Sequence, residues 1–243
     1  MNPRTPPPAS PPASPPASPP AMPARSGAGA EPRAPRWERR KQSRPTELLE
    51  AALSCFVERG YAATRLEDVA SQAGVSKGTL YLYFSSKDEL FKAVVRGNLV
   101  PLIEAYRHDL EQSELSGREL LQRFFEGWWL RVGATRLAGI AKLILGEAGN
   151  FPDVAEFFVS EVTAPTWALL GTILRRGIAA GEFRAVDVEA ACVIWMSPLI
   201  LRAVWMHAIA PKYEASHALS DDRFLQTHLD LVLAALRPDG QCP

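Results

Sequence analysis

The chain has 243 residues and 47% hydrophobic content, enough for one large folded domain or two small ones with a sizeable core. Its three cysteines, Cys55, Cys192 and Cys242, are widely spaced, which excludes a disulfide framework and a cysteine-based metal site. We therefore expect a cytoplasmic protein in which Cys55 and Cys192 are small core residues.

The formal net charge of zero conceals an asymmetry along the chain. Residues 33–97 hold 12 Lys and Arg against 8 Asp and Glu, whereas residues 98–243 hold 13 against 18. A basic N-terminal segment on an acidic body is typical of a DNA-binding head joined to a regulatory body. Chance variation in surface charge is the alternative interpretation.

Residues 1–43 form a tail of two parts. Residues 1–34 are dominated by Pro, Ala and Ser, so we expect disorder or polyproline structure, and they lack the apolar core of a signal peptide. Residues 33–44 carry six basic residues around Trp37. This basic arm either follows the minor groove of DNA or is a solvated linker, and non-specific phosphate contact is the favoured interpretation.

Residues 46–59 have the apolar periodicity of an amphipathic helix, which Gly60 ends. The segment that follows, 64–84, predicts two short helices that cross at a glycine turn. Thr64 and Glu67 have capping-box spacing, Gly74 permits a left-handed turn, and Ser76 is a good N-cap for a second helix over 77–84. Together these elements predict a three-helix head with a helix-turn-helix, whose second helix enters the major groove.

The outward positions of this motif carry donors, aromatics and one glycine, although any small helical domain can contain such a turn. Lys77 and Thr79 can bond base edges or phosphates, and Gly78 lets the backbone approach the duplex closely. The predicted DNA contacts are Thr64, Arg65, Ser76, Lys77, Gly78, Thr79, Tyr81, Leu82, Tyr83 and Lys87.

Four short runs in this region give the chain a specific resemblance: GYAAT (60–64), DVASQAGVS (68–76), GTLYLYF (78–84) and SKDEL (86–90). The sequence resembles the N-terminal signature of the TetR family of one-component transcriptional repressors, over residues 46 to about 95. The resemblance implies a helical, ligand-binding and dimerising remainder of variable sequence, and it favours repression.

Ser86 is expected to cap a helix that runs to about residue 111 and is interrupted between Gly97 and Pro101. We predict a bend there through which a ligand alters the orientation of the head, and a kink needed only for packing is the alternative. Five further helices are predicted over residues 117–132, 136–148, 153–180, 187–208 and 221–236, and no strand pattern occurs. Asp187 is the expected N-cap of the fourth of these.

The last two predicted helices carry long apolar faces, which suit a four-helix dimer interface. We assign to these faces Val193, Met196, Leu199, Ile200, Ala203, Phe224, Leu225, Leu229, Val232 and Leu236. Residues 192–210 are long enough to span a bilayer, but a central arginine is costly in lipid, so we predict no membrane segment.

Aromatic residues concentrate in the C-terminal body, which is typical both of a ligand pocket between helices and of a plain aromatic core. The predicted pocket residues are Phe125, Trp128, Trp129, Phe158, Trp167 and Trp195. Such a pocket favours a hydrophobic small molecule, and Arg131 or Arg136 is the candidate anchor for an acidic one.

An enzyme is the leading rival class, but no nucleophile elbow, phosphate loop or zinc pattern occurs, and the four histidines are scattered. We predict no catalytic residue, metal or cofactor. A second rival is a DNA-binding regulator without a small-molecule effector, controlled by a partner or acting architecturally.

The sequence thus predicts an all-α homodimeric regulator associated with the bacterial nucleoid. Residues 44–95 form a helix-turn-helix domain for an inverted-repeat operator, and residues 96–237 form a helical bundle for ligand binding and dimerisation. Residues 238–243 are predicted to be disordered. A hydrophobic effector would favour a spacing of the two heads that no longer fits the operator.

Overall fold

The computed structural model describes residues 36–210 and 219–238, and these residues form helices and connecting turns without a strand. The predicted all-α fold class is confirmed. The predicted tail before residue 36, the C-terminal residues after 238 and Cys242 lie outside the described residues.

The first four helices form the head: α1 (Arg36–Ala63), α2 (Leu66–Gln72), α3 (Lys77–Tyr81) and α4 (Lys87–Asn98). The backbone is helical from Arg36, so the predicted start at residue 46 was wrong and part of the presumed basic arm belongs to α1. Gly60 interrupts α1 as predicted, with a φ of 82° that strongly favours glycine.

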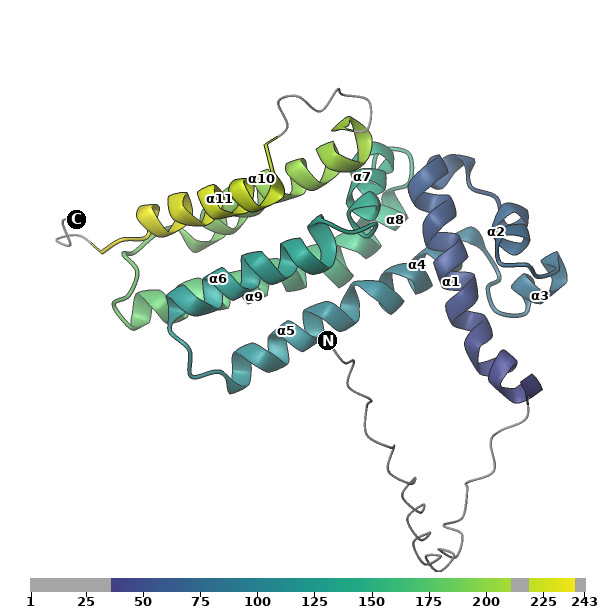
Figure 1. Ribbon diagram of the computed structural model, residues 1–243, viewed down its shortest axis with the longest axis horizontal. Coiled ribbons are helices and arrows are strands. Elements are labelled where there is room, and N and C mark those ends of the chain that lie inside the picture. Colours follow the sequence, from purple (N-terminus) through teal and green to yellow (C-terminus); the bar gives the residue numbers. More distant parts are fainter. Residues whose placement is uncertain (1–35, 211–218, 239–243) are drawn as a thin grey trace, which may run out of the picture.

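The remaining helices form the body, which extends away from the head as an elongated bundle (Figure 1). These elements are α5 (Val100–Gln112), α6 (Gly117–Trp128), η1 (Trp129–Gly133), α7 (Ala138–Glu147), α8 (Pro152–Phe158), η2 (Val159–Thr163), α9 (Ala164–Ala179), α10 (Val188–Ala208) and α11 (Asp221–Ala235). Two of them, η1 and η2, are π-helical turns that continue α6 and lead from α8 into α9. α5 lies along one edge of the bundle, and α10 and α11 lie along the opposite edge (Figure 1).

Local signals place most helix starts where the sequence predicts them. Ser76, Ser86 and Asp187 each accept a hydrogen bond from a backbone N–H in the first turn of α3, α4 and α10. Gly74 makes the turn between α2 and α3 with a φ of 64°. The second helix of the motif is shorter than predicted, because α3 ends at Tyr81 rather than at Phe84.

The hydrophobic core of the head continues into the body. Phe56, Tyr61 and Phe91 are buried together in the head, and the same cluster includes Ile140 of α7 and Phe157 of α8. Gly139 allows α7 to approach α1 closely, since a Cβ there would lie 2.5 Å from a Val57 methyl group. Head and body are therefore packed against one another rather than joined by a free linker.

A second core fills the body and corrects the predicted dimer face. Met196, Leu199 and Ala203 of α10, Leu229 and Val232 of α11 and Leu236 just after it are buried inside the chain itself. Among the ten residues assigned to that face, the exposed one is Val193. The large apolar side chains that α10 and α11 do expose are Val193, Ile194, Leu201, Trp205 and Leu231.

Two helical stretches, residues 152–179 and Val188–Ala208, are long and apolar enough to cross a membrane by length and composition. Both pack against other helices of the bundle: α9 lies against α6 and α10, and α10 lies against α7. Part of their apolar surface, including Leu170, Leu174 and Leu199, is thus buried inside the protein.

Candidate functional sites

The outer face of the head is formed by α3 and the turns beside it. Tyr81, Leu82 and Tyr83 are exposed there, Leu82 to 84%, although side chains of this kind are usually buried. Ser76, Lys77 and Gly78 are exposed beside them, and Arg65 is exposed just before α2. The helix-turn-helix thus gathers most of the predicted DNA contacts on one surface.

Lys77, the first residue of α3, has two partners on this surface. Its ammonium group forms an ion pair with Glu67 of α2 and lies 5.7 Å from the centre of the Tyr81 ring. The hydrogen bond between them lowers the pKa of Glu67 and raises that of Lys77. The ion pair links the two helices of the motif. It also keeps an acidic group beside Lys77, the candidate base contact.

The side chains of Ser76 and Thr79 already form hydrogen bonds at the start of α3. The Ser76 hydroxyl accepts a hydrogen bond from the Thr79 N–H at 3.1 Å and lies 2.9 Å from the Thr79 hydroxyl. Capping of α3 therefore uses part of their hydrogen-bonding capacity.

Thr64 does not belong to this surface, so its predicted roles as a helix cap and a DNA contact need correction. Its side chain is 1% exposed, and its hydroxyl donates to the carbonyls of Cys55 and Gly60 at 3.1 and 2.7 Å. The N-cap of α2 is Arg65, without a side-chain capping bond. The reason lies at Gly60: the break in α1 leaves carbonyl groups that Thr64 satisfies.

Lys87 is also directed inward, which argues against its predicted role as a phosphate contact. Its ammonium group donates to the carbonyls of Tyr61 and Ala62 at 2.8 and 3.2 Å, at the end of α1. It also lies 4.5 Å from the centre of the Tyr61 ring. Burial lowers the pKa of Lys87, against an opposing effect of Glu147. A cation at a helix C-terminus is a stabilising arrangement, so this lysine holds α4 against α1.

The body contains a cavity of about 320 Å³, partly open to solvent and lined by side chains from Leu99 and the helices α5 to α10. That volume lies at the lower end of the range for small-molecule pockets. The lining residues are Leu99, Leu102, Ile103, Tyr106, Phe124, Trp128, Val132, Leu137, Ala141, Ile144, Leu145, Phe158, Val159, Val162, Thr163, Thr166, Trp167, Leu169, Met196 and Ile200. No charged residue lines it, and the Thr166 hydroxyl is already engaged with the Val162 carbonyl at 2.7 Å.

Three of the six predicted pocket residues, Trp128, Phe158 and Trp167, line this cavity. The other three do not, since they fill the protein interior or its edge. Phe125 is fully buried against His228, with ring centres 5.1 Å apart, and Trp129 packs on Phe224 at 5.7 Å. Trp195 is half-buried against the body core.

Sequence reasoning missed the aliphatic part of the wall, above all Leu102 and Ile103 on α5. No residue of α5 is fully buried, although the helix has an apolar face. This is the signature of a helix that faces a hollow, but it becomes visible only when burial is known. Of the two candidate anchors, Arg136 donates to the Ser54 hydroxyl at 3.0 Å, between head and body, whereas Arg131 lies over the ring of Tyr106, a cavity residue.

The cavity wall reaches the junction between head and body at two places. Leu99, the residue between α4 and α5, is 5% exposed and lines the cavity. The predicted interruption of this helix is therefore confirmed, and it lies at Leu99. The π-helical turn η2 contributes Val159 and Val162 to the wall, and its Glu161 forms an ion pair with Arg96 of α4. Helices with π-turns are frequent at functional sites.

No group of three or more His, Cys, Asp or Glu residues suited to a metal ion occurs in the described part of the chain.

Two families of known proteins match the chain. Residues 48–94 match the bacterial regulatory proteins of the tetR family, and residues 119–237 match the C-terminal domain of the AefR-like transcriptional repressors. The transcriptional repressor KstR2 of Mycobacterium tuberculosis is 43% identical over 200 residues, which cover 82% of this chain and 95% of that protein. The fatty acid metabolism regulator protein of Bacillus subtilis is 27% identical over 154 residues, or 62% of this chain and 78% of that protein.

Solved structures with the same architecture include the transcriptional regulator FadR of Bacillus subtilis in complex with stearoyl-CoA. It superposes with a TM-score of 0.63 at 23% identity and covers 79% of this chain and 99% of that chain, a likeness of fold. The TetR-family regulator PfmR of Thermus thermophilus gives a TM-score of 0.61 at 27% identity over 78% of this chain and 98% of that chain.

Proposed function

Because the chain belongs to the TetR family of bacterial regulatory proteins, we propose that it represses transcription from an inverted-repeat operator until an apolar small molecule fills its cavity. It is a DNA-binding transcriptional regulator of the ligand-responsive repressor type. We propose in addition that the operator is an inverted repeat, that the effector is apolar and that the protein acts in the bacterial cytoplasm.

One observation carries the proposal: the wall of the uncharged cavity contains both Leu99 and the η2 turn, two of the places at which the body meets α4. A ligand that expands this wall would displace α4 and with it α1, the helix against which α2 of the helix-turn-helix packs. Coupling of this kind requires only that the ligand prefer one of two head orientations.

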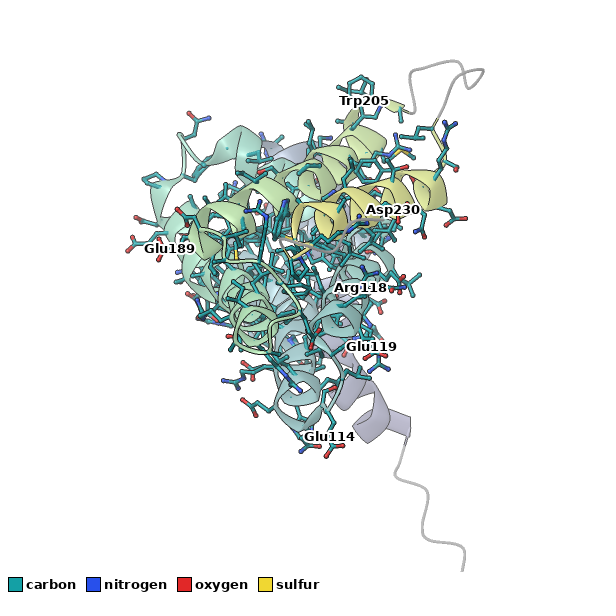
Figure 2. All side chains as sticks on the ribbon, turned by 90° about the vertical axis from the view of Figure 1, so that its left-hand side faces the viewer. Glu114, Arg118, Glu119, Glu189, Trp205 and Asp230 are labelled. Atoms are coloured by element: carbon teal, nitrogen blue, oxygen red, sulfur yellow. The ribbon has the colours of Figure 1, made fainter. Side chains whose placement is uncertain are left out.

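We propose that two chains pair through the exposed apolar strip of α10 and α11, formed by Val193, Ile194, Leu201, Trp205 and Leu231. Trp205 stands at the outer edge of the bundle (Figure 2). Large exposed apolar side chains grouped on neighbouring helices are typical of association surfaces. Two-fold pairing presents two heads to two half-sites, which is why the operator should be an inverted repeat.

An effector with a long hydrocarbon body fits the cavity best, since its wall offers packing and almost no hydrogen bonding. A bound acyl-CoA in the FadR structure and the name of the fatty acid metabolism regulator support this ligand class.

The experiment that tests the function is selection of bound sequences from a random duplex pool by the purified protein at moderate salt. Recovery of one inverted repeat is expected, followed by its release on addition of medium-chain and long-chain acyl compounds. A pool without an enriched motif would contradict sequence-specific reading. A motif that no apolar compound releases would favour the regulator without a small-molecule effector.

A further inference from the structure

A second hollow, of about 290 Å³, lies beside the inner cavity and is lined by residues of α5, α6, η1 and α9. Tyr106, Phe124 and Leu169 line both spaces, so these three side chains form the partition between them. We call the two spaces the inner cavity and the outer hollow. A ligand long enough to pass the partition would occupy both.

The two spaces differ in polarity. The inner cavity has no charged residue in its wall, whereas the outer hollow is lined by Arg123, Arg131, Asp109 and Glu126. Neither arginine forms an ion pair within the described residues, and both are exposed. Glu126, by contrast, accepts a hydrogen bond from Gln122 at 2.7 Å. The outer hollow thus holds two guanidinium groups, which suit an anion, beside the carboxylates of Asp109 and Glu126.

One of the three partition residues, Tyr106, lacks a hydrogen-bond partner for its hydroxyl group within the part of the chain that the structure describes. The hydroxyl of Tyr106 is buried without a hydrogen-bond partner among the described residues, and an unpaired buried hydroxyl is unfavourable. The ring fits only because residue 127 is glycine, since a Cβ there would overlap the Tyr106 hydroxyl. The Arg131 guanidinium covers the same ring at 5.1 Å from its centre. A turn of the Tyr106 side chain would release its hydroxyl from this unpaired, buried position.

We propose that the effector is amphipathic: its apolar body fills the inner cavity, and its anionic end lies in the outer hollow against Arg131 and Arg123. Tyr106 turns aside to let it pass. This inference rests on the proposed function and specifies its ligand. The shared chemistry is an anion at the end of a hydrocarbon body, either a carboxylate or the phosphates of a larger carrier.

The test compares two probes of equal chain length, dodecanoate and dodecanol, kept below the concentrations at which they aggregate. Calorimetry should give the wild-type protein an affinity for the acid about tenfold higher than for the alcohol, as expected for a charge-assisted hydrogen bond. In Arg131→Gln this preference should fall to about twofold, with dodecanol affinity unchanged. Arg118→Gln is the matched control, because Arg118 is an exposed arginine of the same helical segment and lies at the edge of the bundle (Figure 2).

Dodecanoyl-CoA distinguishes the two sources of the anion. Tighter binding of the CoA ester than of the acid, lost in Arg123→Gln, would assign the outer hollow to phosphates, and the reverse order would assign it to a carboxylate.

Equal affinity for acid and alcohol in the wild-type protein would overturn the inference, as would an Arg131→Gln variant that weakens both probes equally. Operator release by dodecanol in either case would leave the proposed function standing. Failure of all three probes to bind and to release the operator would contradict the apolar effector as well.

Discussion

The guanidinium of Arg96 lies 2.8 Å from the carboxylate of Glu161, which joins the helix that leaves the head to a π-helical turn of the cavity wall. The arginine also lies over the ring of Phe157, 4.9 Å from its centre, just before that turn. The ion pair lowers the pKa of Glu161 and raises that of Arg96. It is the most direct polar link between the ligand site and α4 in the described structure.

We expect Glu161→Gln to weaken the coupling between effector and operator by about threefold, because an exposed ion pair carries only a modest interaction. Operator affinity without ligand and effector affinity without operator should each change by less than about twofold. The measurement is the ratio of effector affinities with and without operator DNA.

Arg107→Gln is the control, since Arg107 forms a comparable exposed ion pair with Glu104 within α5. An unchanged ratio in Glu161→Gln, or an equal loss in the control, would show that coupling follows another route.

Lys77→Ala should weaken binding to the selected operator by about tenfold or more and binding to random DNA far less, because a base contact discriminates sequence and a phosphate contact does not. Filter binding to both DNAs at several salt concentrations measures the difference. Equal losses would reduce Lys77 to a phosphate contact. Glu67→Gln, which removes its ion-pair partner, should tighten binding to both DNAs.

Lys87→Met should lower the free energy of unfolding by about 1–2 kcal/mol, because it removes two hydrogen bonds to carbonyls at the end of α1. The slope of operator affinity against salt concentration should not change, since the ammonium group faces inward. Arg65→Gln, at an exposed position of the motif, should reduce that slope by about one. A reduced slope in Lys87→Met would restore this lysine as a DNA contact.

Tyr106→Phe should stabilise the ligand-free protein by about 1 kcal/mol, because it removes a buried hydroxyl that has no partner in the described structure while keeping the ring. Chemical denaturation measures this difference. A loss of stability would mean that the hydroxyl is satisfied in solution, by water or by a turned side chain. Gly127→Ala should have the opposite effect, since its methyl group would collide with the same hydroxyl.

Because His228 is buried, we expect the folded protein to lose stability in mild acid. Burial lowers its pKa below the ordinary value of 6.5, against a weaker opposing effect of the Trp195 carbonyl. The histidine therefore stays neutral in the folded chain while the unfolded chain takes up a proton, so stability is full above pH 6.5 and falls as the pH drops through the lowered pKa.

Denaturation of wild-type protein and His228→Leu at pH 7.5 and about pH 5 should show a larger loss in the wild type. Parallel losses in the two proteins would assign the acid sensitivity to other groups.

The elements that sequence predicted well are those decided by neighbouring residues. Gly74, Ser76 and Ser86 act through backbone groups within a few positions of themselves. Their roles can therefore be predicted from the neighbouring sequence. Thr64 was misassigned because the break of α1 at Gly60 directs its hydroxyl back to the carbonyls of Cys55 and Gly60 rather than to the start of α2. Lys87 was misassigned because its partners, the carbonyls of Tyr61 and Ala62, are distant in sequence and only the folded chain brings them within reach.

The cavity was harder to predict for a related reason. Aromatic residues such as Phe125 and Trp129 fill space, whereas a cavity is bounded by residues whose neighbours fail to fill it. No composition or period distinguishes these two cases. The half-buried face of α5 and the two π-helical turns depend on how whole helices pack against one another. This packing cannot be predicted from the pattern of a single sequence.

A wall almost without hydrogen-bonding groups can rank ligands only by length and bulk. Each additional methylene that fits the inner cavity should strengthen binding by about fourfold, from roughly 0.8 kcal/mol of transfer free energy, until the chain meets the end of the space. The response to a homologous series would then be a gradient with a cut-off. A single Leu-to-Phe or Leu-to-Ala change at Leu102 would move that cut-off, so the effector range of this scaffold can be retuned in small steps without touching the operator.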